Sequence, residues 1–389
     1  MARSVRAFVN PAVLRWARES TGYGIAESAK RAGIQGDVLE QAESGDHHLT
    51  LRQAEALARF YERPFAVLFL KEPPHEEELE TRFRRFPGTP PLPWPPKLIS
   101  LTRRVGERQT QAADLYQVLG ETPLWGQSSF LYTGGTAEQA ASSARARLRI
   151  SLEAQKSWRD RDGYKPLRAW ITAAEQLGVL VMQNGDVPPE EMRGFSSPHR
   201  DVPVVVLNTK DHPCARAFTV LHELGHLLRT RTGVQSESRD EEWCNEFAGS
   251  VLMPLESFRV DLENEWKHSP GIDAIDEVAR QYGVTSQAAA VRASRRRIIA
   301  ESDIDRVFQI IKSREQRRKQ KQTEKSQGGD PNRNTVARLG PGFISLIFDA
   351  LDQDMVSDST ASRLLEAKID RFEGIRGAIE ERAALGDRF

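Results

Sequence analysis

The sequence has few cysteines, no long apolar run and no excess of charge of either sign. Its 389 residues include only two cysteines, Cys214 and Cys244, too few for the disulfide framework of a secreted protein. The longest apolar runs, residues 65–70 and 202–207, fall far short of the ~20 residues that are needed to span a bilayer. The start of the chain contains no apolar core of a signal peptide. We therefore expect a cytoplasmic protein that has no membrane span.

The charges of the chain balance. Its 55 Lys and Arg residues match 55 Asp and Glu residues, so the formal net charge is zero. This balance excludes proteins that coat nucleic acid through a large excess of cations over phosphates. Hydrophobic residues make up 39% of the chain and charged residues 28%, which is too apolar for wholesale disorder. At roughly 100–200 residues per domain, the length predicts two to four domains.

The N-terminal part of the chain has the pattern of a small helical bundle. Within residues 10–70, glycines separate short segments of helical periodicity, which predicts five short helices. We place the first domain at residues 1–72. Residues 73–97 are rich in proline and charge, a composition that disfavours regular structure and predicts an extended linker.

Residues 98–270 combine helical patterns with two valine-rich stretches. These stretches, residues 179–184 and 202–208, are bounded by Gly, Pro and Asn, which predicts two strands that pair as a hairpin. Two helices are expected after the second strand, and the second of them ends at Pro254. We place a domain with a small sheet in this segment.

Three further segments follow. Residues 271–326 predict helices, and within residues 292–325 there are 12 basic and 5 acidic side chains. This basic stretch either holds nucleic acid or forms a solvated face of a long helix. It lacks interleaved aromatic residues, and the helix face is the commoner explanation. Residues 327–334 predict a flexible linker, and residues 335–389 predict a helical C-terminal region.

The strongest chemical signal is the run His222-Glu223-Leu224-Gly225-His226. Residues four apart lie one above the other on a helix, so that the imidazoles of His222 and His226 can reach one metal ion. Glu223 lies about 100° around the helix axis, where its carboxylate can take a proton from a water bound at the open position of the metal. The run predicts a zinc site in which Glu223 is the general base.

A catalytic zinc ion takes three protein ligands, so a third ligand must come from another segment. Glu241 and Glu242, in the second predicted helix, are the candidates, and an ordinary solvated acidic run is the alternative. Glu241 shares a helix face with Asn245, whose amide can orient a ligand histidine. We expect Glu241 to bind the metal, with Glu242 as the alternative. Neither cysteine has the spacing of a structural zinc site, and we expect both to be buried packing residues.

Residues 202–254 resemble the ImmA/IrrE family of regulatory zinc metallopeptidases. The strand VPVVVLN, the HELGH helix and the helix E-x-x-x-N-x-F-A that ends in L-M-P occur in the order and spacing of that family. The resemblance implies a zincin-like domain in which His222, His226 and Glu241 bind Zn²⁺ and Glu223 is the general base.

Residues 1–72 resemble a Cro/cI-type (XRE) helix-turn-helix domain, the usual companion of these peptidases. This segment holds ten basic and nine acidic side chains, an excess of only one positive charge. Docking into a DNA groove normally rests on a larger excess of cations. The segment therefore either binds DNA or serves as a helical interaction module, and we assign no individual DNA-binding residue.

Together these features predict an α+β, mostly helical protein with a helix-turn-helix bundle, a zincin-like domain and a helical C-terminal extension. The resemblance implies a zinc-dependent endopeptidase that cleaves a protein substrate, a transcriptional repressor, in response to stress or a mobile-element or phage signal. The main alternative is a DNA-binding transcriptional regulator whose peptidase-like domain senses a partner without cutting it. A third alternative is a defence protein in which the helical C-terminal region recognises a partner and releases the peptidase.

Overall fold

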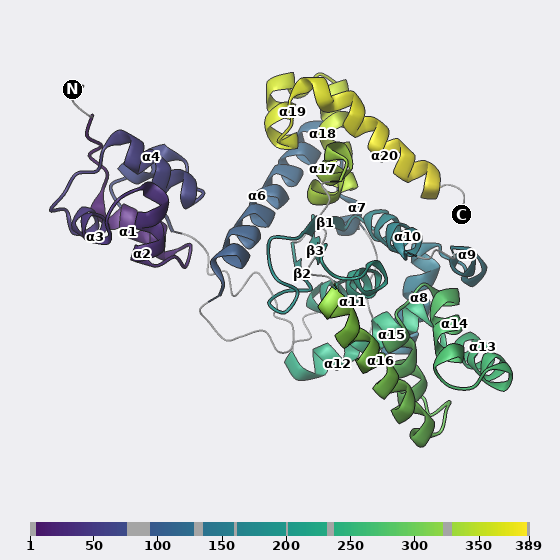
Figure 1. Ribbon diagram of the computed structural model, residues 1–389. Helices are drawn as coiled ribbons and strands as arrows, with labels where there is room; N and C mark the ends of the chain where they lie inside the picture. Colours follow the sequence, from purple (N-terminus) through teal and green to yellow (C-terminus); the bar gives the residue numbers. More distant parts are fainter. Residues whose placement is uncertain are drawn as a thin grey trace. The chain divides into compact units, whose positions relative to one another are not determined.

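The structure is a computed structural model in which the chain forms two compact units (Figure 1). The N-terminal unit reaches Gly106, and the C-terminal unit begins at Glu107. Most of the predicted linker 73–97, from residue 76 to 93, lies outside the described residues, as do residues 327 and 328 of the predicted linker 327–334. The structure describes residues 5–75, 94–127, 135–158, 162–199, 201–231, 237–321 and 329–386.

The N-terminal unit is a bundle of short helices whose ends are set by local signals. Asn10 accepts a hydrogen bond from the Ala12 amide and so caps the first helix. Gly33 ends the second helix in a left-handed conformation, with φ of 67°. Thr50 and Gln53 form a capping box at the fourth. The elements of residues 10–70 are α1 (Pro11–Glu19), α2 (Ile25–Ala32), α3 (Gly36–Ser44), α4 (Leu51–Phe60) and the 3-10 helix η1 (Phe65–Phe69).

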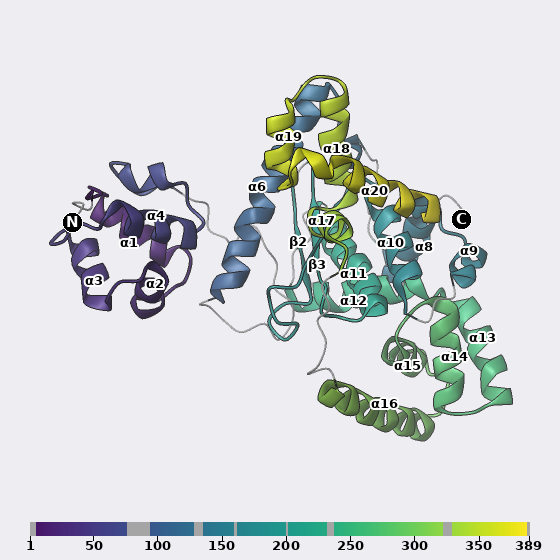
Figure 2. The same ribbon diagram turned by 45° about the horizontal axis from the view of Figure 1, so that its top comes forward.

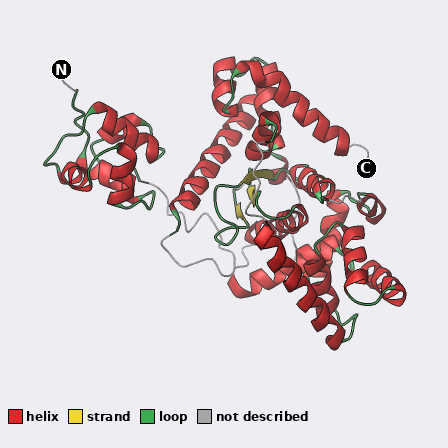
Figure 3. Cartoon of the chain, viewed as in Figure 1, coloured by secondary structure: helices red, strands yellow, loops and turns green. Residues whose placement is uncertain are grey.

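The C-terminal unit contains a three-stranded sheet in the order β1-β3-β2 (Figure 3). Its strands are β1 (Leu180–Asn184), β2 (Gly194–Ser197) and β3 (Val204–Asn208). β1 pairs with β3 in parallel and β2 pairs with β3 in antiparallel. The predicted hairpin of residues 179–184 and 202–208 is therefore wrong. Both stretches are strands, but they run in the same direction, because β2 returns the chain between them.

Helices cover the sheet and supply most of the core of this unit (Figure 2). α11 packs on β2 and β3, whereas α10, α17 and α18 pack on β1. The helices are α6 (Pro96–Leu119), which begins in the N-terminal unit, α7 (Leu124–Gln127), α8 (Ala137–Leu148), α9 (Leu152–Ser157), α10 (Tyr164–Glu175), α11 (Pro213–Arg231), α12 (Glu237–Leu252), α13 (Leu255–His268), α14 (Ile272–Tyr282), α15 (Ser286–Arg295), α16 (Glu301–Lys321), α17 (Pro331–Leu339), α18 (Pro341–Asp352), α19 (Asp358–Leu365), the 3-10 helix η2 (Ile369–Arg371) and α20 (Phe372–Gly386).

The C-terminal helices pack directly on the edge of the sheet. Gly340, between α17 and α18, has φ of 87°, and a Cβ there would lie 2.7 Å from the Val181 carbonyl oxygen of β1. Only glycine permits this approach without strain. Residues 331–334, which we expected in the linker 327–334, instead begin α17, because Asp330 caps its first amides and Pro331 opens it.

The structure confirms the predicted α+β, mostly helical class with a small sheet. Among the helices of the described ranges, none combines the length and the apolar character that a bilayer crossing requires.

Candidate metal centre

His222 and His226 lie on one face of α11, a single turn apart. Both side chains are buried, and their Nε2 atoms are 3.1 Å apart. The helix is held in place by Leu221, Leu224 and its other apolar residues, which belong to the core of the C-terminal unit. The amphipathic pattern of the helix thus fixes the two imidazoles so that they point to one position.

Glu241 of α12 completes a cluster with the two histidines. Its Oε2 lies 3.3 Å from His222 Nε2, and its Oε1 lies 3.2 Å from His226 Nε2. Ligand atoms held at 2.0–2.1 Å from a tetrahedral zinc ion are about 3.3–3.4 Å apart, so these three groups fit a metal ion of that size. Glu241 Oε2 is also buried and accepts no hydrogen bond from the described residues, which leaves it available to a cation.

The electrostatics of Glu241 also suit a ligand. Burial opposes its ionisation, but contacts with His222 and His226 outweigh burial and lower the pKa of Glu241 to about 2. Its neighbour Glu242 is exposed and lies outside the cluster. Asn245 is half-buried, one turn after Glu241, and forms no hydrogen bond to either imidazole within the described chain. Its proposed orienting role stays a prediction.

Glu223 points to the sheet rather than into the cluster. Its side chain is buried, and this burial raises the pKa of Glu223 to about 7, against the effects of His222 and of hydrogen bonds from Ser196 of β2. A carboxyl group with such a pKa can accept and return a proton near neutral pH. The structure therefore places an acid–base group beside the two imidazoles and next to strand β2.

Gly225 permits the close crossing of α11 and α12. A Cβ at this position would lie 3.2 Å from Cys244 Sγ and from Phe247 Cδ1, both on α12. Because Gly225 has no side chain, the two helices can pack closely enough for Glu241 to contact the histidines. Both cysteines are buried, as their isolation in the sequence predicts, and burial raises the pKa of the Cys244 thiol.

A buried ion pair beside the cluster was not found from the sequence. Arg229, one turn after His226, donates its Nε to Asp240 Oδ1 at 2.5 Å, and both side chains are buried. The guanidinium also lies 5.1 Å from the ring centroid of Trp243. Because Asp240 directly precedes Glu241, this pair ties α12 to α11 beside the His222, His226 and Glu241 cluster. The only signal in the sequence was an arginine and an aspartate on two helices that were expected to pack.

β2, which the sequence analysis missed, lies against α11. A Cβ on Gly194 would lie 2.5 Å from Thr219 Cγ2 of α11 and 2.7 Å from the Val206 carbonyl oxygen. Figures 1 and 2 both show β2 and β3 beside α11. Glycine at this position lets the strand approach the helix, which brings Ser196 to Glu223.

Comparison with protein families gives a match over residues 174–294, somewhat less than a third of the chain. The matching family is peptidase M78, described as the IrrE N-terminal-like domain. A comparison with curated proteins gave no match. The matched residues include the three strands, α11 and α12, and therefore the whole His222, His226 and Glu241 cluster. The match supports assignment of this segment to the ImmA/IrrE-type, zincin-like metallopeptidases, a metal-dependent family.

Proposed function

We propose that the protein is a zinc-dependent endopeptidase. The observation that carries this proposal is the convergence of His222 Nε2, His226 Nε2 and Glu241 on one position, with the separations of tetrahedral zinc ligands. Zinc bound there supplies a Lewis acid and lowers the pKa of a water toward 7. His222, His226 and Glu241 would hold the ion.

Glu223 acts as the general base. Its carboxylate lies on the helical turn of His222, and it accepts the proton of the attacking water and delivers it to the leaving amine nitrogen of the peptide. Hydrogen bonds from Ser196 hold the carboxylate in place.

The substrate is expected to lie along β2 rather than β3. The VPVVVLN strand, β3, is the central strand, with β1 on one side and β2 on the other, so it offers no free edge to a substrate. The Asn208 amide donates to the Arg193 carbonyl, and hydrogen-bonded pairs alternate along an antiparallel ladder. By this alternation the peptide groups of Gly194 and Ser196 point away from β3. The Ser196 N–H already donates to Glu223, so the Gly194 peptide group and the Ser196 carbonyl are the groups that can pair with an extended substrate.

We propose a protein substrate, specifically a transcriptional repressor whose cleavage follows a stress or mobile-element signal. The ImmA/IrrE resemblance supports this choice, because members of that family are regulatory peptidases. The test is incubation of the purified protein with the repressor encoded beside it, with analysis of the fragments by mass spectrometry.

Variants of the site separate metal binding from cleavage. We expect Glu223→Gln to keep zinc and lose cleavage, and His222→Ala to lose both. Glu241→Gln should lower zinc content, whereas the matched control Glu242→Gln should change neither property, because Glu242 is exposed. Zinc content is measured by mass spectrometry of the intact protein. Cleavage by Glu223→Gln at the wild-type rate would refute the mechanism.

We also propose that the N-terminal unit is a helix-turn-helix module that binds a protein partner. α2 and α3 are joined by three residues that begin with the left-handed Gly33, as is typical of this motif. α3 carries the exposed acidic side chains Asp37 and Glu40 and no basic residue, which opposes approach to phosphates. A mobility shift with promoter DNA at low salt, lost on removal of residues 1–72, would instead favour the DNA-binding regulator.

A further inference from the structure

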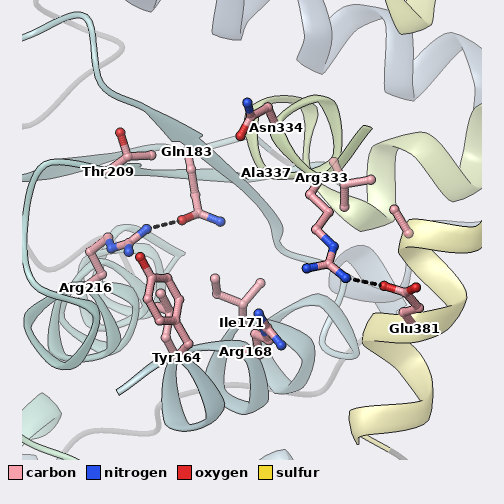
Figure 4. Close-up of a pocket in the computed structure, with 13 residues that line it drawn as sticks. Tyr164, Arg168, Ile171, Gln183, Thr209, Arg216, Arg333, Asn334, Ala337 and Glu381 are labelled. Atoms are coloured by element: carbon pink, nitrogen blue, oxygen red, sulfur yellow. Dashed lines mark hydrogen bonds and ion pairs between the residues drawn. The ribbon is translucent and has the colours of Figure 1, made fainter. Parts of the chain in front are cut away.

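A cavity of about 330 Å³ opens in the C-terminal unit between the sheet and the C-terminal helices (Figure 4). Its lining comes from α10, β1, the end of β3, α11, α17 and α20. A volume of this size lies at the lower end of the range of small-molecule sites. None of the lining residues is a metal ligand or Glu223.

The cavity is lined by a buried arginine, Arg216, whose Nε has no hydrogen-bond partner among the described residues. Arg216 of α11 is 5% exposed, its Nη1 donates to Gln183 Oε1 at 2.5 Å, and its guanidinium lies 5.6 Å from the ring centroid of Tyr164 (Figure 4). Within the described chain, Nε of Arg216 has no hydrogen-bond partner, whereas Tyr164 and the carboxylate of Asp211 act on its guanidinium. Burial accordingly lowers the pKa of Arg216.

Three other buried arginines of this unit each form an ion pair with a carboxylate of the chain. Arg108 pairs with Glu366, Arg229 with Asp240 and Arg292 with Glu246. Burial of a guanidinium without an opposite charge costs free energy, so buried arginines are usually paired with a carboxylate. Arg216 differs from these three arginines because it lines the cavity, where a bound anion would add to the compensation that Asp211 provides.

The rest of the cavity favours an organic anion. Arg168 and Arg333 also line it, and the one lining carboxylate, Glu381, pairs with Arg333 at 2.8 Å near the mouth. Three guanidinium groups against one carboxylate leave an excess of positive charge. Leu167 and Ile171 provide an apolar wall beside the charged floor.

We infer that this cavity binds a small organic anion, a carboxylate or a phosphate monoester with an apolar body, and that Arg216 holds its oxyanion. A guanidinium presents parallel N–H donors that match two oxygens of such a group. The inference does not depend on the proposed peptidase activity, because it uses no residue of the metal centre.

The test measures ligand-induced stabilisation of the full-length protein. Inorganic phosphate, citrate and adenosine monophosphate are titrated in a thermal unfolding assay, with adenosine and sodium chloride as controls for the uncharged body and for ionic strength. We expect at least one of the three anions to raise Tm in proportion to the logarithm of its concentration. Phosphate and citrate distinguish the two oxyanion classes. No rise with any of the three anions beyond the chloride control would overturn the inference.

Variants identify Arg216 as the binding group. Arg216→Gln keeps a donor for Gln183 but removes the charge, and we expect affinity for the anion to fall about tenfold or more. Without ligand, Tm should change little, because the substitution removes a buried charge together with its cost of desolvation. Arg295→Gln, an exposed arginine of α15 outside the cavity, is the matched control and should bind as the wild type does. Equal affinity of Arg216→Gln and wild type would refute the assignment.

Two further measurements test anion binding in the cavity if the Arg216→Gln variant folds poorly. Arg333→Gln changes an exposed residue at the mouth and should weaken binding by a few fold without loss of Tm. Bound anion should also slow hydrogen exchange in α17 and α20, because both helices line the cavity. Exchange that is unchanged by ligand would contradict binding at this place.

Discussion

Asp240→Ala removes the carboxylate that compensates the buried guanidinium of Arg229. The side chains of Asp240 and Arg229 are 1% and 9% exposed, so neither group gains much solvent when the other is lost. Removal of one partner of such a pair costs about 3–5 kcal/mol, because the remaining charge stays buried. In a unit of this size each kcal/mol lowers Tm by about 2–4 °C. We therefore expect Tm to fall by roughly 6–20 °C.

A double-mutant cycle separates the ion pair from general effects of each substitution. Arg229→Met alone should also destabilise, but the combined Asp240→Ala and Arg229→Met variant should lose less than the sum of the two, by about 0.5–3 kcal/mol. Thermal unfolding in the presence of EDTA excludes any contribution of bound metal. The exposed neighbour Glu242→Ala is the control and should change stability by less than about 0.5 kcal/mol.

The same cycle tests whether the pair positions the metal ligands. Asp240 precedes Glu241, so we expect Asp240→Ala to lower zinc affinity about tenfold in a chelator competition assay. A purely structural pair would alter Tm and leave the zinc affinity of the folded protein unchanged. Additive losses in the cycle, or wild-type Tm for Asp240→Ala, would show that the buried pair does not act as argued.

Three other predictions follow from the packing and charges of the C-terminal unit. Gly225→Val should force α11 and α12 apart, since even a Cβ at this position would lie 3.2 Å from Cys244 Sγ. We therefore expect a zinc titration of this variant to show weaker binding. Unchanged zinc affinity would contradict the role of this crossing. Gly194→Val meets backbone at 2.7 Å and should destabilise the fold by about 1–3 kcal/mol in urea unfolding, whereas a neutral effect would show that β2 can shift. Burial raises the pKa of Glu246, but Arg292 and Arg296 outweigh burial and lower this pKa below 4.5. The ionised Glu246 carboxylate therefore stabilises the fold above pH 4.5, and this stabilisation is lost as the pH falls through the pKa of Glu246 in the folded protein. Glu246→Gln should therefore flatten the acid limb of a Tm–pH profile, and an unchanged acid limb would exclude this linkage.

The metal cluster was predictable to the extent that it depends on helical periodicity. His222 and His226 share a face because of their spacing alone. The choice of Glu241 over Glu242 needed the packing of α12 on α11, which leaves the first carboxylate facing the histidines and the second in solvent. The sequence shows which faces are apolar, but it does not show the rotation of one helix against another.

The sheet was predictable only in its two valine-rich strands. β2 has four residues, Gly194–Ser197, and only Phe195 is apolar, so it lacks the alternation that marks a strand. Without β2, the two longer strands were read as a hairpin. The cavity at Arg216 was not predictable either, because its lining comes from residues between 164 and 381, brought together only by tertiary packing.

One face of α11 connects the two proposed sites. Arg216 and Glu223 are seven residues apart, so they lie on the same side of the helix and about 10 Å apart along its axis. Arg216 contacts Gln183 of β1, and Glu223 contacts Ser196 of β2. These strands are separated by two strand spacings, also about 10 Å. The helix therefore crosses the full width of the sheet, with the cavity at one edge and Glu223 at the other.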